Sequence, residues 1–202
     1  MSSLNHNATF DCLFIADHLK NQKMGFSKEE VHLFAYLACL LWLYQKRVVN
    51  DWGYIFVGTV YGAPFSREID VSLSALHGAS FLRRDQDRFY AIKETVEPQL
   101  RNLASLKMNQ ERVECLRAAC SSTMAFSIGM VGSALANEPE LSRAREVHLS
   151  RPLLEEAAQE QLFEHFKALR NALDQRSTDL RLPAVVWLAA LYQTNKCTYG
   201  EA

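Results

Sequence analysis

Apolar residues along most of the chain recur three or four positions apart, which predicts a mainly helical protein. The most apolar segment is residues 31–44, VHLFAYLACLLWLY. It follows a capping box, in which Ser27 and Glu30 satisfy each other's backbone amides at a helix start. Because the segment is apolar on nearly all sides, we expect a central core helix or a helix partly covered by another chain. Its 14 residues are too few to span a bilayer comfortably.

Residues 64–92 predict a second, more distinctive unit. Ser66 is placed to cap a helix by accepting a hydrogen bond from an amide of the first turn, and Gly78 is placed to end it. The apolar face of this helix consists of Ile69, Leu73 and Leu76. The pattern therefore predicts a short amphipathic helix with one buried face.

A tight, charged β-hairpin is expected directly after that helix. Residues 80–84 and 88–92 have the composition of short strands, and Asp85, Gln86 and Asp87 suit a chain reversal. A helix followed at once by such a hairpin is typical of a winged helix-turn-helix with a small β-hairpin wing. Residues 51–62 would supply the short second helix and turn, although their aromatic and β-branched content equally fits a short strand.

Helices are predicted on both sides of this unit. One covers residues 9–22, one covers residues 96–106, and a long run covers residues 108–136. Further helices are expected from Ser150-Arg151-Pro152 and from Pro183, where proline is tolerated in a first turn. We therefore predict a winged-helix domain with N-terminal helices over residues 1–107 and an all-helical domain over residues 108–202.

Residues 118–136 carry no charge, which raises the question of a transmembrane segment. Their serines and glycines and the absence of a flanking basic cluster favour close packing in a soluble core instead. The N-terminus lacks a secretory signal pattern, and the five cysteines form no C-x-x-C pair. Together these features predict a cytoplasmic protein with reduced thiols and no membrane association.

The net charge of −1 gives no overall attraction to nucleic acid. Residues 44–101 hold eight basic and seven acidic residues, so the predicted winged helix is nearly neutral. Candidate contacts to a DNA backbone are Arg67, Arg83, Arg84 and Arg88. Glu68 and Asp70 lie beside Arg67 at the end of the helix that would approach a groove, where carboxylates repel phosphates. Any DNA contact by the chain alone is expected to be weak.

The sequence holds no recognised catalytic or metal-binding motif. The six histidines are scattered without ligand spacing, and neither a phosphate-binding G-x-x-x-x-G-K-[ST] loop nor a G-x-S-x-G elbow is present. We therefore predict a non-enzymatic protein without catalytic residues, cofactor or metal.

Apolar helix surface and aromatic residues favour an interaction protein. The stripe over residues 162–173 is suited to a partner helix as well as to internal packing. The candidate interface residues are Phe34, Leu41, Trp42, Tyr54, Phe56, Tyr61, Leu162, Phe166 and Leu169.

The order of these segments resembles a known family. The capped apolar helix of residues 27–44, the segment YGAPFSREIDVSLSALHGASFL, the RRDQDRFYAI hairpin and the helical second half resemble the small middle subunits of bacterial ABC-three-component defence systems of the Lamassu type. The resemblance covers about residues 25–140 and is one of size and element order. It implies a non-catalytic, kleisin-like winged-helix adaptor that docks on an SMC-like ATPase and helps to hold an effector nuclease inactive.

Two functional hypotheses follow. In the first, the chain is an adaptor or regulatory subunit of an anti-plasmid or anti-phage defence complex. In the second, it is a winged-helix transcriptional regulator that binds DNA as a dimer. The two differ in the role of the hairpin arginines, which matter for DNA affinity only in the second.

Overall fold

The computed structural model describes residues 4–20, 25–173 and 179–199 and confirms a mainly helical protein. The α-helices are α1 His6–Leu19, α2 Lys28–Tyr44, α3 Arg67–Gly78, α4 Lys93–Ala104, α5 Gln110–Ser121, α6 Ile128–Leu135, α7 Pro139–Glu146, α8 Glu156–Ala172 and α9 Arg181–Tyr199. The 3₁₀ helices are η1 Val49–Trp52, η2 Lys107–Asn109 and η3 Ser122–Met124. The strands are β1 Val57–Gly58, β2 Pro64–Phe65, β3 Leu82–Asp85, β4 Arg88–Ala91 and β5 Arg151–Pro152.

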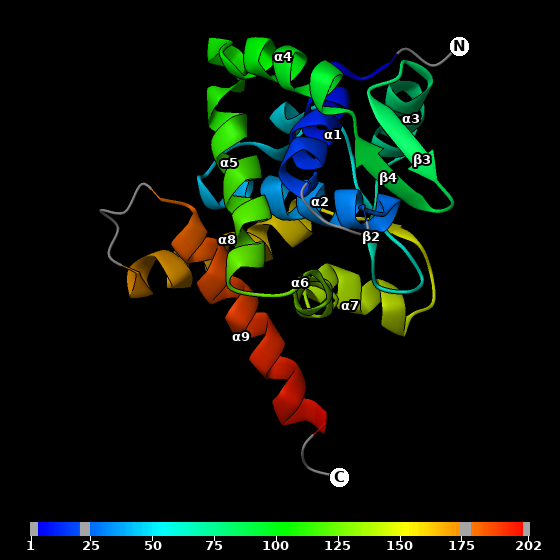
Figure 1. The fold of residues 1–202 in the computed structure, drawn as a ribbon. Helices are drawn as coiled ribbons and strands as arrows, with labels where there is room; N and C mark the ends of the chain where they lie inside the picture. The colour runs from blue at the N-terminus through cyan, green and yellow to red at the C-terminus, as the bar shows by residue number, and fades with distance from the viewer. Residues whose placement is uncertain (1–3, 21–24, 174–178, 200–202) are drawn as a thin grey trace.

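Helix α2 lies at the centre of the molecule, as its apolar sequence predicts (Figure 1). The predicted capping box is present: the Glu30 amide donates to the Ser27 hydroxyl, and the Glu30 carboxylate accepts from the Ser27 amide. Nearly every residue from Val31 to Leu43 is buried. The helix is therefore enclosed by the chain itself.

The predicted hairpin is also present. Strands β3 and β4 pair antiparallel over Leu82–Asp85 and Arg88–Ala91, and Gln86 adopts a positive φ in the turn between them. A third segment joins this sheet through Phe26, which exchanges both backbone hydrogen bonds with Phe89 of β4. The hairpin is thus held to the start of α2 as well as to α3.

Ser66 precedes α3 as predicted, but its hydroxyl does not cap the helix. The hydroxyl hydrogen-bonds to the Glu68 carboxylate, and the Ser66 amide donates to Nδ1 of His32 on α2 at 3.2 Å. Burial lowers the pKa of His32 to about 4, so the imidazole is neutral and able to accept this bond. A histidine on the core helix therefore fixes the start of α3.

The long helical run predicted over residues 108–136 is broken into α5, η3 and α6. Within the described ranges no single helix has both the length and the apolarity to cross a membrane; the stretches Lys107–Met124 and Ile128–Leu135 meet that test only jointly, across a bend of 115°. Helix α9 packs beside this bend, and its C-terminal end projects from the body of the molecule (Figure 1).

The second half is not all-helical, which corrects the sequence prediction. Arg151 and Pro152 form strand β5, whereas a helix start was expected there, and α8 begins at Glu156. Strand β5 pairs with β1, which also pairs with β2, to make a three-stranded antiparallel sheet in the order β2-β1-β5. Of residues 51–62, the first two end the 3₁₀ helix η1 and residues 57–58 form β1, so the strand alternative describes this segment better than the short second helix of a helix-turn-helix.

The predicted boundary at residue 107 falls at η2, between α4 and α5. One hydrophobic cluster nevertheless contains residues from both sides of it, because α5 packs against α2 and α1. Strand pairing between β1 and β5 adds a second connection across the boundary.

Candidate functional site

The first candidate surface is formed by α3 and the hairpin, the face that a DNA-binding winged helix would turn towards DNA. Arg88 pairs with Glu30 at 2.9 Å, and Asp70 of α3 pairs with Lys28 at 2.5 Å. Both partners come from the first turn of α2, so these ion pairs connect α2 to the hairpin and to α3. The Arg88 guanidinium is therefore engaged in an ion pair within the chain.

The other hairpin arginines are exposed but also have internal contacts. Arg84 donates to the Gln86 carbonyl at 2.8 Å and lies 3.4 Å from the Asp87 carboxylate. The Arg83 guanidinium lies over the Tyr90 ring at 4.9 Å. Arg67 is exposed at the start of α3, and Glu68 follows it directly in the sequence. The structure thus brings Arg83, Arg84 and Arg88 onto one hairpin and interleaves them with carboxylates.

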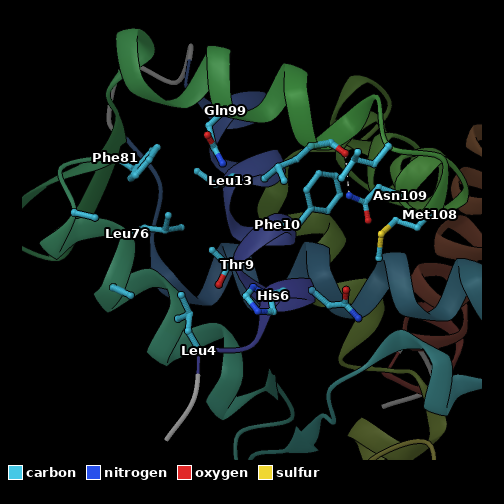
Figure 2. A pocket seen from close by; sticks show the side chains of 15 residues that line it. Leu4, His6, Thr9, Phe10, Leu13, Leu76, Phe81, Gln99, Met108 and Asn109 are labelled. Atoms are coloured by element: carbon cyan, nitrogen blue, oxygen red, sulfur yellow. Dashed lines mark hydrogen bonds between the residues drawn. The ribbon is translucent and has the colours of Figure 1, made fainter. Parts of the chain in front are cut away.

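The second candidate is an apolar pocket of about 540 Å³ between α1, α3 and α4 (Figure 2). Its floor contains Phe10 and Leu13 of α1, both nearly inaccessible to solvent. Leu76 and Phe81 line one side, and Met108, which is 79% exposed, stands at the edge. No sequence pattern predicts this pocket, because residues from four separate segments form it and none belongs to a motif.

Most of the predicted interface residues lie in the interior, which corrects their assignment to a docking surface. The buried members are Phe34, Leu41, Tyr54, Phe56, Leu162 and Phe166. Trp42 and Leu169 are half-buried, and the Trp42 indole donates to the Val48 carbonyl at 3.0 Å. Their apolar character is explained by packing around α2.

Tyr61 is the exception: it is 86% exposed at the turn between β1 and β2. Three further exposed apolar residues, Ile55, Phe65 and Leu149, lie on or next to the β2-β1-β5 sheet. We call this set the Tyr61 patch. Because large apolar residues are exposed on and beside this small sheet, it is a candidate interaction surface.

A buried ion pair joins a residue from the first half of the sequence to one from the second half. The Arg112 guanidinium of α5 donates to both oxygens of Asp11 on α1, at 2.6 and 2.7 Å, and to the Trp52 carbonyl at 2.9 Å. It also lies 3.8 Å from the centre of the Trp52 ring. Burial raises the pKa of the Asp11 carboxyl, and the Arg112 charge opposes that shift. Both charged groups are buried and hydrogen-bonded within the chain, so we assign the pair a structural role.

Glu138 is a second buried carboxyl, at the start of α7. One oxygen accepts from the amides of Glu140 and Leu141 and from the Tyr36 hydroxyl, while the other has no hydrogen-bond partner. Burial raises the pKa of Glu138 to about 7, an effect that the two amides partly offset. Because its bonded oxygen accepts from two first-turn amides, we assign this carboxyl to the cap of α7.

Metal-ligating and redox groups do not converge in the described parts of the chain. Residues 4–20, 25–173 and 179–199 contain no cluster of three potential metal ligands. Cys12, Cys39, Cys115 and Cys120 are free and buried, and burial raises the pKa of Cys115 to about 12. The Cys197 side chain lies outside the described set.

Comparison of the chain with protein families, with characterised proteins and with solved structures finds no match.

Proposed function

We propose that the chain is a non-catalytic winged-helix adaptor of an anti-plasmid or anti-phage defence complex, which docks on an SMC-like ATPase and an effector nuclease. The observation that carries this proposal is the charge balance of α3 and the hairpin. Arg88 and Asp70 are paired with residues of α2, and Arg84 is turned back onto its own hairpin. A face that neutralises its own charges releases few counterions from DNA and gains little affinity for it.

The order of elements supports the winged-helix part of the proposal. Helices α1, α2 and α3 pack together, and β3 and β4 follow α3 directly. Phe26, between α1 and α2, pairs with Phe89 of β4, as the additional strand of a winged-helix sheet would. The connection from α2 to α3 is longer than a helix-turn-helix turn and carries β1 and β2. We assign the Tyr61 patch, on this connection and the adjoining β5, to the docking surface.

The test compares complex assembly with DNA binding. Tagged protein is purified from its native cells with nuclease treatment, and the recovered proteins are identified by mass spectrometry. We expect recovery of a coiled-coil ATPase in fixed stoichiometry. An Ile55→Ser/Tyr61→Ser variant should lose the ATPase, because it removes the two most exposed apolar side chains of the patch. Met124→Ser, which alters an equally exposed apolar residue outside the patch, is the matched control.

The hairpin is tested separately with Arg83→Glu/Arg84→Glu, which leaves the Arg88–Glu30 ion pair intact. This variant should assemble like the unaltered protein, and duplex binding by the purified chain should be weak before and after the change. Recovery of the protein alone, with tight and salt-sensitive duplex binding that the double substitution abolishes, would establish the transcriptional regulator instead.

A further inference from the structure

We propose that the pocket between α1, α3 and α4 binds a small, mainly apolar molecule with one hydrogen-bonding end. The proposal is separate from the adaptor function and concerns a different surface from the Tyr61 patch. The volume of about 540 Å³ lies within the range of small-molecule sites, roughly 300–1,000 Å³. Its walls come from α1, from α3 with Phe81, and from α4 with η2, and they border one space that is open on one side (Figure 2).

The polar groups of the pocket define the expected ligand. Asn7, Thr9 and Asn109 are engaged within the chain, because their side chains donate to the carbonyls of Trp52, Asn5 and Leu103. His6 and Gln99 also line the pocket, but their side chains make no hydrogen bond to any described residue.

Gln99 reaches into the space from α4 (Figure 2). An apolar body would therefore fill the region over Phe10, Leu13 and Leu76, while a carboxylate or hydroxyl would meet Gln99 or His6 at the rim.

The dimensions favour a small molecule over a protein partner. A specific protein interface buries about 800 Å² on each side. The pocket holds only a drug-sized volume, and its deepest residues are Phe10, Leu13 and Leu76, each nearly inaccessible to solvent. A protein segment would have to cover Leu4, Leu106 and Met108 as well, whereas a short alkyl chain reaches the floor directly.

The probes for the test are decanoate and decanol, which share an alkyl body and differ in the charge of the polar end. Isothermal titration calorimetry should show saturable binding of one of them at a single site per chain. The shorter homologue of the tighter probe, octanoate for decanoate or octanol for decanol, should bind about tenfold more weakly. The reason is that it places two fewer methylenes in the apolar pocket. Amide chemical-shift changes should be confined to α1, α3, α4 and η2.

Ala75→Phe is the decisive variant, because Ala75 lines the pocket and a phenyl ring there occupies it. We expect at least a tenfold loss of affinity and the loss of probe-induced thermal stabilisation. Gln99→Ala should weaken binding less, by removing the polar contact alone. Asn102→Ala, an exposed change on α4 outside the pocket, should bind within about twofold of the unaltered protein.

Three results would overturn the proposal. They are the absence of saturable binding up to the solubility limit of both probes, unchanged binding by a folded Ala75→Phe variant, and a dimer that Ala75→Phe dissociates while neither probe binds. The last result would assign the pocket to a second copy of the chain. A circular dichroism spectrum of Ala75→Phe establishes that the variant is folded, and Leu103→Phe fills the pocket from the opposite wall if it is not.

Discussion

Replacing Arg112 with methionine is expected to destabilise the protein by about 3–5 kcal/mol, the usual effect of breaking a buried ion pair from one side. The substitution removes the two bonds to Asp11 and the bond to the Trp52 carbonyl. It leaves the Asp11 carboxyl, which is 0% exposed, with the Tyr54 hydroxyl as its remaining hydrogen-bond donor. Urea unfolding followed by tryptophan fluorescence measures the loss, since Trp52 lies directly against the guanidinium.

A double variant distinguishes the effect of the unpaired charge from that of lost packing. Asp11→Asn/Arg112→Met removes both charges and keeps an acceptor for the Tyr54 hydroxyl, so it should be more stable than Arg112→Met alone. Arg117→Met, on the exposed side of the same helix, is the control and should change stability by no more than about 0.5 kcal/mol. Two results would contradict the assignment of Asp11 and Arg112 as a buried, ionised pair. One is a stability loss below about 1 kcal/mol for Arg112→Met, and the other is a double variant no more stable than Arg112→Met.

The elements predicted well from sequence are those whose signals are local. The capping box of α2 lies within four consecutive residues, and the hairpin is encoded by two short strands around Asp85, Gln86 and Asp87. Strand β5 was missed because Arg151-Pro152 has a good helix-start composition, and its pairing with β1 is specified by tertiary contacts. Ser66 was assigned the wrong hydrogen bond because its hydroxyl bonds to the nearby Glu68 carboxylate instead of to an amide of the first turn. The bond from its amide to His32 of α2 is a tertiary contact that the local pattern does not report.

The candidate sites were less predictable because they depend on which apolar residues remain at the surface. Phe34 and Tyr61 are both aromatic residues in apolar surroundings, yet the first is fully buried under its own chain and the second is exposed. Composition does not separate a core residue from an interface residue. The Asp11–Arg112 pair joins residues on α1 and α5, a contact that no local pattern of a single sequence reports.

The pH dependence of stability should reveal two buried groups with opposite effects. The pKa of His32 is lowered by burial to about 4 from an ordinary value of 6.5, so the unfolded chain binds the proton first and stability falls as the pH drops from 6.5 towards 4. The pKa of Glu138 is raised by burial to about 7 from 4.5, so the unfolded chain loses the proton first and stability falls as the pH rises from 4.5 to 7. Each shift corresponds to about 3 kcal/mol over its full range.

Between pH 4.5 and 6.5 these two contributions oppose each other, and single substitutions should separate them. Glu138→Gln imitates the protonated carboxyl and keeps an acceptor for the Tyr36 hydroxyl and the α7 amides. It should match the unaltered protein near pH 4.5 and be more stable by roughly 2–3 kcal/mol at pH 8. Its stability should therefore rise with pH between 4.5 and 6.5, where the His32 contribution remains.

His32→Asn should have the reverse effect, because its amide oxygen can accept from the Ser66 amide without binding a proton. Over the same range its stability should gain less with rising pH than that of the unaltered protein, since the His32 contribution is gone while burial still lowers the pKa of His18 and raises that of Glu138. Glu146→Gln, at the exposed end of α7, controls for the loss of a carboxylate from that helix and should follow the unaltered protein. Denaturant unfolding at a series of pH values measures all four proteins. A Glu138→Gln variant less stable than the unaltered chain at pH 8 would show that the ionised carboxylate stabilises the α7 start despite its burial.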